Sequence, residues 1–463
     1  KRVTMGTLAR SLGRSFVIAI VSLAAAIALT MASVIHAAVH LTGTTALIVP
    51  GTGTKDPSLK LNYEQNAVDY YTSTTTALCS PTCAYAPVPY ISEFWPFPLP
   101  GWGGLTGAKW NVSVASGVTN LNSKLVGSYN PSPTDPVVVF GFSQGSTVAT
   151  KVKAILGDLT AEQKAIIAFV LTGDPNRPNG GLFERLALLG TVPILDATFG
   201  QPAPTDTGIA TTDIAFQYDG VPDFPLYPIN LLADLNALAG FAYIHTTYLS
   251  PKGSDAPSET PYGYTVAEIE AMMVAATADC TAATHCQVTG DTRYITVPNK
   301  TLPILQPLIG LGNALGISAV ITPLVDLVSP ALRVLIETGY DRTLPYGTPA
   351  PFRLIPLINP ITFTIDLVNA VGQGIQAALN DLVPVQTGVP ATGSNIAARQ
   401  PSASSIQARR GTSGTSSASR AAAATTDKRV GAAGRLATAH QSSKRVGLRA
   451  ASSSATRGWR VPA

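Results

Sequence analysis

Ser143 lies at the centre of the sequence GFSQG, residues 141–145, with a glycine two positions away on each side. This spacing is typical of a nucleophile elbow, a sharp strand-to-helix turn that lifts a serine hydroxyl above the edge of a sheet. The N-terminus of the following helix would face the oxyanion that forms when the serine attacks an acyl carbonyl, and the Gln144 N–H can donate a hydrogen bond to it. The motif predicts Ser143 as the nucleophile of acyl-ester chemistry.

A serine nucleophile needs a base, and the chain has only five histidines. His36 and His40 lie in or beside an N-terminal apolar run, and His440 lies in a polar tail. His285 lies between two cysteines in a predicted loop. His245 follows a predicted helix late in the fold, which is where an α/β-hydrolase keeps its base. Elimination therefore predicts His245 as the general base.

The acid of such a triad should follow a strand between the serine and the histidine, and three aspartates do so. Asp223 is the favoured choice, because the glycine at position 220 helps its loop to turn the carboxylate back toward the imidazole. Asp219, in the same sequence YDGVPDFP, is the second choice. Asp174 is expected to cap or turn its own loop. The chosen carboxylate would orient His245 and stabilise its imidazolium.

A second oxyanion donor is expected from the loop after the first strand, PGTGT at residues 50–54. Thr52 can donate through its backbone N–H and its hydroxyl, and the alternative is that Gly-Thr-Gly forms only a tight turn. The loop does not match a phosphate loop, because no Gly-Lys-Ser/Thr follows it. The oxyanion hole is therefore predicted from Gln144 and Thr52, and neither a cofactor nor a metal is expected.

Positioning these residues requires strands that alternate with helices. Strand patterns occur at residues 45–50, 136–140, 165–171 and 213–218, and those at 136–140 and 165–171 are typical of strands buried on both faces. Helical patterns lie at residues 114–126, 147–156 and 231–241. This alternation predicts an α/β fold with a central parallel sheet.

The C-terminal part of the chain changes character twice. Apolar segments at residues 302–320 and 325–336 are divided by proline and glycine, and we expect short apolar helices there. These helices either add core to the sheet, which is the favoured interpretation, or form a lid or a surface that rests on lipid. From about residue 390 the chain is rich in Ala, Ser, Thr, Gly and Arg, a composition that predicts disorder.

The N-terminus has the pattern of an export segment. Arg10 and Arg14 precede an apolar run from Phe16 to Val39, which is longer than a usual signal core and long enough to span a bilayer. A cleaved signal peptide and an uncleaved anchor both fit, and the anchor is favoured. Positive charge before the run predicts that the rest of the chain is exported, to be anchored at the membrane or secreted to the cell envelope.

These features predict four regions: a signal peptide or anchor, a catalytic domain, an apolar helical extension that packs on or covers it, and a disordered basic tail. They are residues 1–40, 41–300, 301–388 and 389–463.

Charge is unevenly distributed around a net value of +4. Residues 1–38 contain four basic and no acidic residues, and residues 391–463 contain 12 basic residues and one acidic residue, which leaves −11 between them. A nucleic-acid binder is expected to carry positive charge on its folded part, so this class is disfavoured. Charged residues make up only 13% of the chain, which indicates extensive burial or contact with lipid.

The four cysteines form two close pairs, Cys79 with Cys83 and Cys280 with Cys286. An even number at short range predicts two local disulfides in an oxidising compartment, and four unrelated buried thiols are the alternative. A zinc site is disfavoured, because neither pair has the CxxC spacing.

The combined motifs resemble the C-terminal hydrolase domain of PE-PPE proteins from mycobacteria and related actinobacteria. The elbow GFSQG is similar to the Gly-Tyr-Ser-Gln-Gly elbow of cutinases. The resemblance spans about Thr45 to Pro351 and includes GDPNRPNGG, YDGVPDFP, NLLADLNALAG, HTTY and the late ETGYDR, Glu337–Arg342. It implies a cutinase-like α/β-hydrolase fold, a Ser-Asp-His triad and esterase activity at the cell envelope.

Membrane-anchored members of that family are linked to acyl transfer onto trehalose glycolipids. The export or anchor segment leads here directly into the catalytic domain, without a PE or PPE helical domain, so the anchored branch is expected. The leading hypothesis is a serine esterase acting on a lipid or glycolipid ester, with acyl transfer between trehalose glycolipids as the alternative. A non-catalytic envelope-binding protein with a degenerate hydrolase fold is a second alternative.

Overall fold

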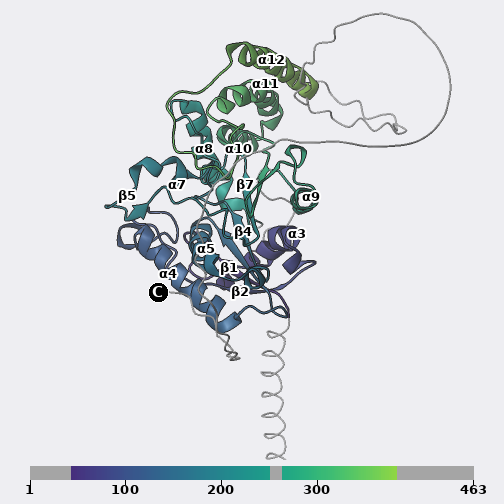
Figure 1. Cartoon of the computed structure of the whole chain (residues 1–463). Helices are drawn as coiled ribbons and strands as arrows, with labels where there is room; N and C mark the ends of the chain where they lie inside the picture. Colours follow the sequence, from purple (N-terminus) through teal and green to yellow (C-terminus); the bar gives the residue numbers. More distant parts are fainter. Residues whose placement is uncertain (1–42, 251–262, 383–463) are drawn as a thin grey trace, which may run out of the picture. The chain divides into compact units, whose positions relative to one another are not determined.

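The computed structural model describes residues 43–250 and 263–382 (Figure 1). Its centre is a seven-stranded sheet in the order β2-β1-β3-β4-β7-β9-β8, in which every neighbouring pair is parallel except β8 and β9. The strands are β1 (Thr45–Val49), β2 (Ala84–Pro87), β3 (Val137–Phe142), β4 (Ile167–Thr172), β7 (Thr211–Phe216), β8 (Cys286–Thr289) and β9 (Thr292–Val297). A separate antiparallel ribbon joins β5 (Thr191–Val192) to β6 (Ala197–Thr198).

Helices cover both faces of this sheet, as the alternating sequence pattern predicts. Alternate residues of β1 belong to two hydrophobic cores, Ala46 and Ile48 to one and Leu47 and Val49 to the other. The first core includes residues of α9 (Val266–Ala278), and the second includes residues of α4 (Trp110–Ser123) and α5 (Gln144–Ile155). The short helices are α2 (Tyr63–Asn66), α3 (Ser73–Thr75), α6 (Ala161–Lys164) and α7 (Leu182–Arg185).

The predicted fold class is confirmed. The strands β1, β3, β4 and β7, which are buried along almost their whole length, correspond to the four predicted strands, and crossover helices connect them. Two disulfides join the predicted pairs, Cys79–Cys83 and Cys280–Cys286. The expected N-terminal export segment and the C-terminal tail lie outside the described residues.

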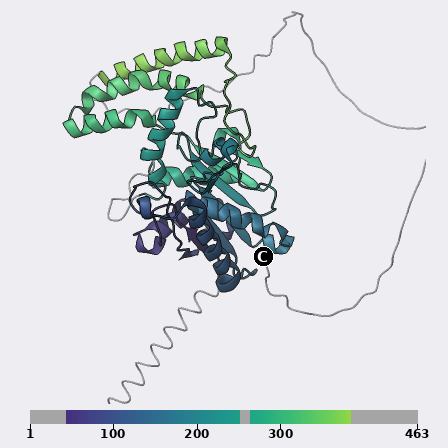
Figure 2. The ribbon, with the colours of Figure 1, turned by 90° about the vertical axis from the view of Figure 1, so that its left-hand side faces the viewer.

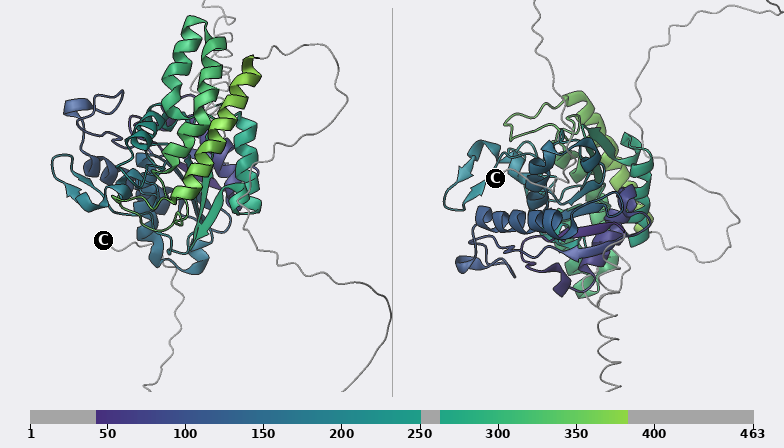
Figure 3. Two further views of the ribbon diagram at one scale, coloured as in Figure 1. Left: turned by 90° about the horizontal axis from the view of Figure 1, so that it is seen from above. Right: turned by 60° about the horizontal axis from the view of Figure 1, so that its bottom comes forward.

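The apolar C-terminal region forms three helices, α10 (Gln306–Leu315), α11 (Ser318–Glu337) and α12 (Pro360–Leu382). They run side by side, as Figures 2 and 3 show. Within the described part of the chain, only α11 is long and apolar enough to cross a membrane by length and composition, with a mean hydropathy of 1.8. A small core joins α11 to α8 (Leu231–Tyr243) and includes Ala233, Val325 and Ile336.

Candidate active site

Ser143 occupies a strained turn between β3 and α5, as a nucleophile elbow requires. Its backbone has φ 55° and ψ −121°, a conformation that non-glycine residues rarely adopt. A Cβ added at Gly145 would overlap the carbonyl oxygens of Val49 and Pro50, and one at Gly141 would lie 2.8 Å from the Gly145 carbonyl oxygen. Both glycines are therefore needed for the elbow to pack against the sheet.

A continuous chain of hydrogen bonds runs from this serine through a histidine to an aspartate. The Ser143 Oγ lies 2.8 Å from Nε2 of His245. On the other side of the ring, Nδ1 lies 2.8 Å from Oδ2 of Asp219. The histidine and the aspartate are both buried, so solvent competes little for these bonds. The geometry is that of a Ser-His-Asp triad.

The His245 ring is held by aromatic and backbone contacts. The residue His245 is the first of a short helical turn, His245–Thr247, which follows α8. The rings of Phe142 and Phe241 stack nearly parallel to it, with centroids 5.1 and 5.7 Å away. Gly173 lies so close that an added Cβ would be 2.9 Å from Cε1 of the imidazole. These contacts fix the plane of the ring and leave its two nitrogens for the serine and the aspartate.

Asp219 lies in the turn directly after β7. Its Oδ1 accepts a hydrogen bond of 3.0 Å from the Val221 N–H, which leaves Oδ2 for the imidazole. Tyr248 packs beside this site, and its hydroxyl accepts a hydrogen bond from the Phe216 N–H. Burial, and then the charge of Asp219, raise the pKa of Tyr248 well above its usual range, so its hydroxyl stays protonated.

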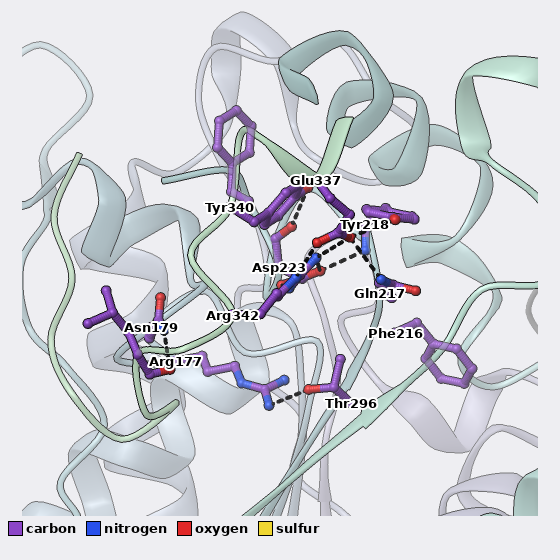
Figure 4. Close-up of polar contacts among 12 residues, drawn as sticks. Arg177, Asn179, Phe216, Gln217, Tyr218, Asp223, Thr296, Glu337, Tyr340 and Arg342 are labelled. Carbon is purple, nitrogen blue, oxygen red and sulfur yellow. Dashed lines mark hydrogen bonds and ion pairs between the residues drawn. The ribbon is translucent and has the colours of Figure 1, made fainter. Parts of the chain in front are cut away.

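The prediction that Asp223 faces His245 is wrong. Both oxygens of Asp223 instead accept hydrogen bonds from Arg342, at 2.6 and 3.1 Å (Figure 4). Burial raises the pKa of Asp223, but the charge and hydrogen bonds of Arg342 outweigh it and bring the pKa below its usual value. The turn itself directs the side chain away, because Asp223 Oδ2 also accepts the N–H of Tyr218.

Asp174 turns its own loop, as expected. Its Oδ1 accepts a hydrogen bond of 2.9 Å from the Asn176 N–H. Burial, and then the charge of Asp213, raise its pKa well above the usual value. Asp174 therefore belongs to a buried polar cluster beneath the site, in which Arg177 forms an ion pair with Asp213 at 3.5 Å.

The two predicted oxyanion donors come from segments that meet at the serine. Gln144 is the first residue of α5, and the first N–H groups of a helix have no acceptor within it. The loop that carries Thr52 reaches the same place, because a Cβ added at Gly51 would lie 3.1 Å from the Ser143 Cβ. The Gly51 carbonyl oxygen accepts a hydrogen bond of 2.7 Å from the Ser92 hydroxyl, and this bond holds the Thr52 loop in place. The donor roles of Gln144 and Thr52 stay predictions.

The Gln144 side chain ties the start of α5 to its surroundings. Its Oε1 accepts a hydrogen bond from the Ser113 hydroxyl at 3.0 Å, and its Nε2 donates a hydrogen bond to the backbone carbonyl of Glu93 at 3.1 Å.

The described residues contain no group of three or more His, Cys, Asp or Glu side chains that could hold a metal ion.

A family model for the PE-PPE domain matches residues 81–341, more than half of the chain. The chain belongs to the PE-PPE domain family. The resemblance seen in the motifs is thereby confirmed, and the PE-PPE match contains Ser143, Asp219 and His245 but ends one residue before Arg342.

Three relatives of this PE-PPE domain come from Mycobacterium tuberculosis strain H37Rv. Esterase PE16 is 36% identical over 74% of this chain and 57% of its own length. SL1278 acyltransferase Chp1 is 30% identical over 68% of this chain and 66% of its own length. Diacyltrehalose acyltransferase Chp2 is 29% identical over 50% of this chain and 57% of its own length. The chain thus spans between about half and two thirds of the length of these relatives.

Among solved structures, a cutinase-like protein from Cryptococcus sp. is similar, with a TM-score of 0.26 and 18% sequence identity. The similarity covers 39% of this chain and 79% of that protein.

Proposed function

We propose that this PE-PPE domain is a serine esterase that cleaves lipid or glycolipid esters through an acyl-enzyme. The observation that carries the proposal is the uninterrupted path of two 2.8 Å hydrogen bonds from Ser143 through His245 to Asp219. Relatives named as an esterase and as acyltransferases support the same class of chemistry.

In the first half of the reaction, Ser143 Oγ attacks the acyl carbonyl while Nε2 of His245 takes the hydroxyl proton. The resulting oxyanion accepts hydrogen bonds from the backbone N–H groups of Gln144 and Thr52. Asp219 stabilises the imidazolium through Nδ1. The tetrahedral intermediate then collapses, His245 returns the proton to the leaving alcohol, and the acyl group stays on the serine as an ester.

In the second half, an acceptor hydroxyl attacks the acyl-serine, and His245 again takes and returns one proton. Water as acceptor gives hydrolysis, whereas a sugar hydroxyl gives acyl transfer. Hydrolysis is the leading proposal. Acyl transfer between trehalose glycolipids is the alternative, and one relative, Chp2, is named a diacyltrehalose acyltransferase.

A lipid substrate and a membrane or cell-envelope location fit the surface of the C-terminal helices. Seven aliphatic side chains of α12 are between 46% and 70% exposed. They are Ile361, Ile365, Val368, Val371, Ile375, Leu379 and Leu382. Large exposed apolar patches mark contacts with lipid, ligands or other proteins. The two disulfides fit an exported protein, since such bonds persist in oxidising compartments.

A fluorophosphonate probe tests the proposed chemistry, because it reacts covalently with an activated serine. We expect the wild-type chain to be labelled and Ser143→Ala to remain unlabelled. A folded wild type that is not labelled contradicts the proposal and favours a non-catalytic envelope-binding protein. Incubation of a lipid ester with and without trehalose, followed by identification of the acyl product, then separates hydrolysis from transfer.

A further inference from the structure

The turn that carries Asp219 is held by residues from much later in the chain (Figure 4). Both terminal nitrogens of Arg342 donate hydrogen bonds to the Asp223 carboxylate, Nη1 to Oδ1 at 2.6 Å and Nη2 to Oδ2 at 3.1 Å. The same guanidinium donates to Glu337, from Nε at 3.0 Å and from Nη2 at 3.2 Å. Such bidentate, charge-assisted bonds fix direction as well as distance. We name Asp223, Glu337 and Arg342 the clamp.

The clamp is connected to Asp219 through the backbone of the turn. The Asp223 N–H donates to the Asp219 carbonyl oxygen at 2.9 Å. The Asp223 carboxylate accepts the N–H of Tyr218, the residue immediately before Asp219, at 2.8 Å. A change in the position of Asp223 would therefore move the backbone on both sides of the Asp219 side chain.

Tyr218 needs this support because its backbone is strained. It has φ 68°, which is unfavourable for an aromatic residue, and its side chain is buried. Its hydroxyl donates to Glu337 at 2.7 Å, and the Arg342 guanidinium lies 5.9 Å from its ring centroid. The clamp thus holds Tyr218 by its backbone and by its side chain.

We propose that Arg342 is a positioning residue of the active site. Its hydrogen bonds to Asp223 and Glu337 hold the strained turn in the position from which Asp219 can bind His245. The inference rests on the proposed function, since it assigns Arg342 a role in the triad chemistry. Arg342 touches neither the serine nor the histidine, and it acts through the turn. The segment 337–342 therefore completes the catalytic site.

Kinetics of Arg342→Gln, Asp223→Asn and the double variant test this role in the full chain. We expect each single variant to lower kcat on a short soluble ester about 10- to 100-fold, because small displacements of a catalytic group have effects of this size. KM should change less than about threefold, and the double variant should be no slower than the slower single variant, because both changes break one pair. The number of active sites is counted by fluorophosphonate titration, so that unfolded protein does not enter kcat.

A matched control is the buried ion pair between Lys153 and Asp291, at 2.8 Å, near the C-terminal end of α5. Lys153→Gln should lower the melting temperature while kcat per titrated site stays at the wild-type value. If Arg342→Gln does not fold, Asp223→Asn carries the same prediction, since it preserves the shape of the side chain.

Separate values of kcat and KM distinguish positioning from a general structural role. A displaced Asp219 slows the chemical step at sites that are folded and titrated, so kcat should fall while KM stays nearly constant. A general loss of structure instead lowers the melting temperature and the number of titrated sites, and it leaves kcat per titrated site at the wild-type value.

The outcomes are distinct. Wild-type kcat per titrated site in both single variants, or a KM that changes as much as kcat does, overturns the positioning role while the proposed function stands. A wild type that the probe does not label removes the proposed function itself.

Discussion

Gly240 in α8 packs directly against the carbonyl oxygen of Tyr218, with no space for a side chain between them. The helix that leads to His245 and the turn that carries Asp219 therefore touch backbone to backbone. This contact, together with the clamp, sets the distance between His245 and Asp219.

Gly240→Ala should disturb both stability and catalysis, because the new methyl group would overlap the Tyr218 carbonyl. We expect a loss of about 1–3 kcal/mol in the free energy of unfolding, typical of overpacking, together with a lower kcat per titrated site. Chemical denaturation and ester hydrolysis measure the two effects. Gly372→Ala is the control, because no atom lies within 4 Å of the added Cβ and alanine favours a helix. Equal behaviour of the two variants contradicts the packing argument.

The exposed face of α12 should matter for aggregated lipid substrates and not for soluble ones. Replacing Ile361, Ile365 and Val368 with serine removes apolar surface without touching the catalytic residues. We expect activity on long-chain esters in vesicles to fall several-fold, while hydrolysis of a short soluble ester is unchanged. Equal loss on both substrates contradicts a role in lipid contact. Deleting residues 302–382 would not isolate this effect, because it would also remove Glu337 and Arg342.

Glu184 should make stability depend on pH. Burial raises its pKa to about 7, so the folded state holds a proton that the unfolded state has already lost. As far as Glu184 determines it, the free energy of unfolding should be highest near pH 4. It should fall as the pH rises from about 4.3 toward 7, and it should become constant above that value. Glu184→Gln should remove about 3 kcal/mol of this dependence, as judged from the shift of its pKa. Urea denaturation at several pH values tests this, and identical slopes for wild type and variant contradict it.

Local sequence determined how well the site could be predicted. The elbow at Ser143 requires glycines and a helix start within five residues, so short-range spacing reveals it. His245 could be found by elimination because histidines are few. Three of the strands, β1, β3 and β4, were recognisable because they are buried on both faces and therefore mostly apolar, whereas β7 begins with the polar residues Thr211, Thr212 and Asp213.

The choice of acid could not be made in the same way. Asp219 and Asp223 lie four residues apart in one turn, and both satisfy the rule that the acid follows a strand. Arg342 lies 119 residues beyond Asp223 in the chain and binds its carboxylate. The carboxylate of Asp219 is therefore the one that bonds to His245. The motif ETGYDR was visible in the sequence, but nothing local indicates which carboxylate its arginine meets.

The most direct test of the triad is a comparison of Asp219→Asn with Asp223→Asn. Both variants preserve the size of the side chain, and kcat per fluorophosphonate-titrated site is measured on the same soluble ester. We predict a loss of about 10⁴-fold for Asp219→Asn, as expected for the acid of a triad, and of no more than about 100-fold for Asp223→Asn, as expected for a displaced turn. Near-normal kcat in Asp219→Asn, or the larger loss in Asp223→Asn, contradicts the account.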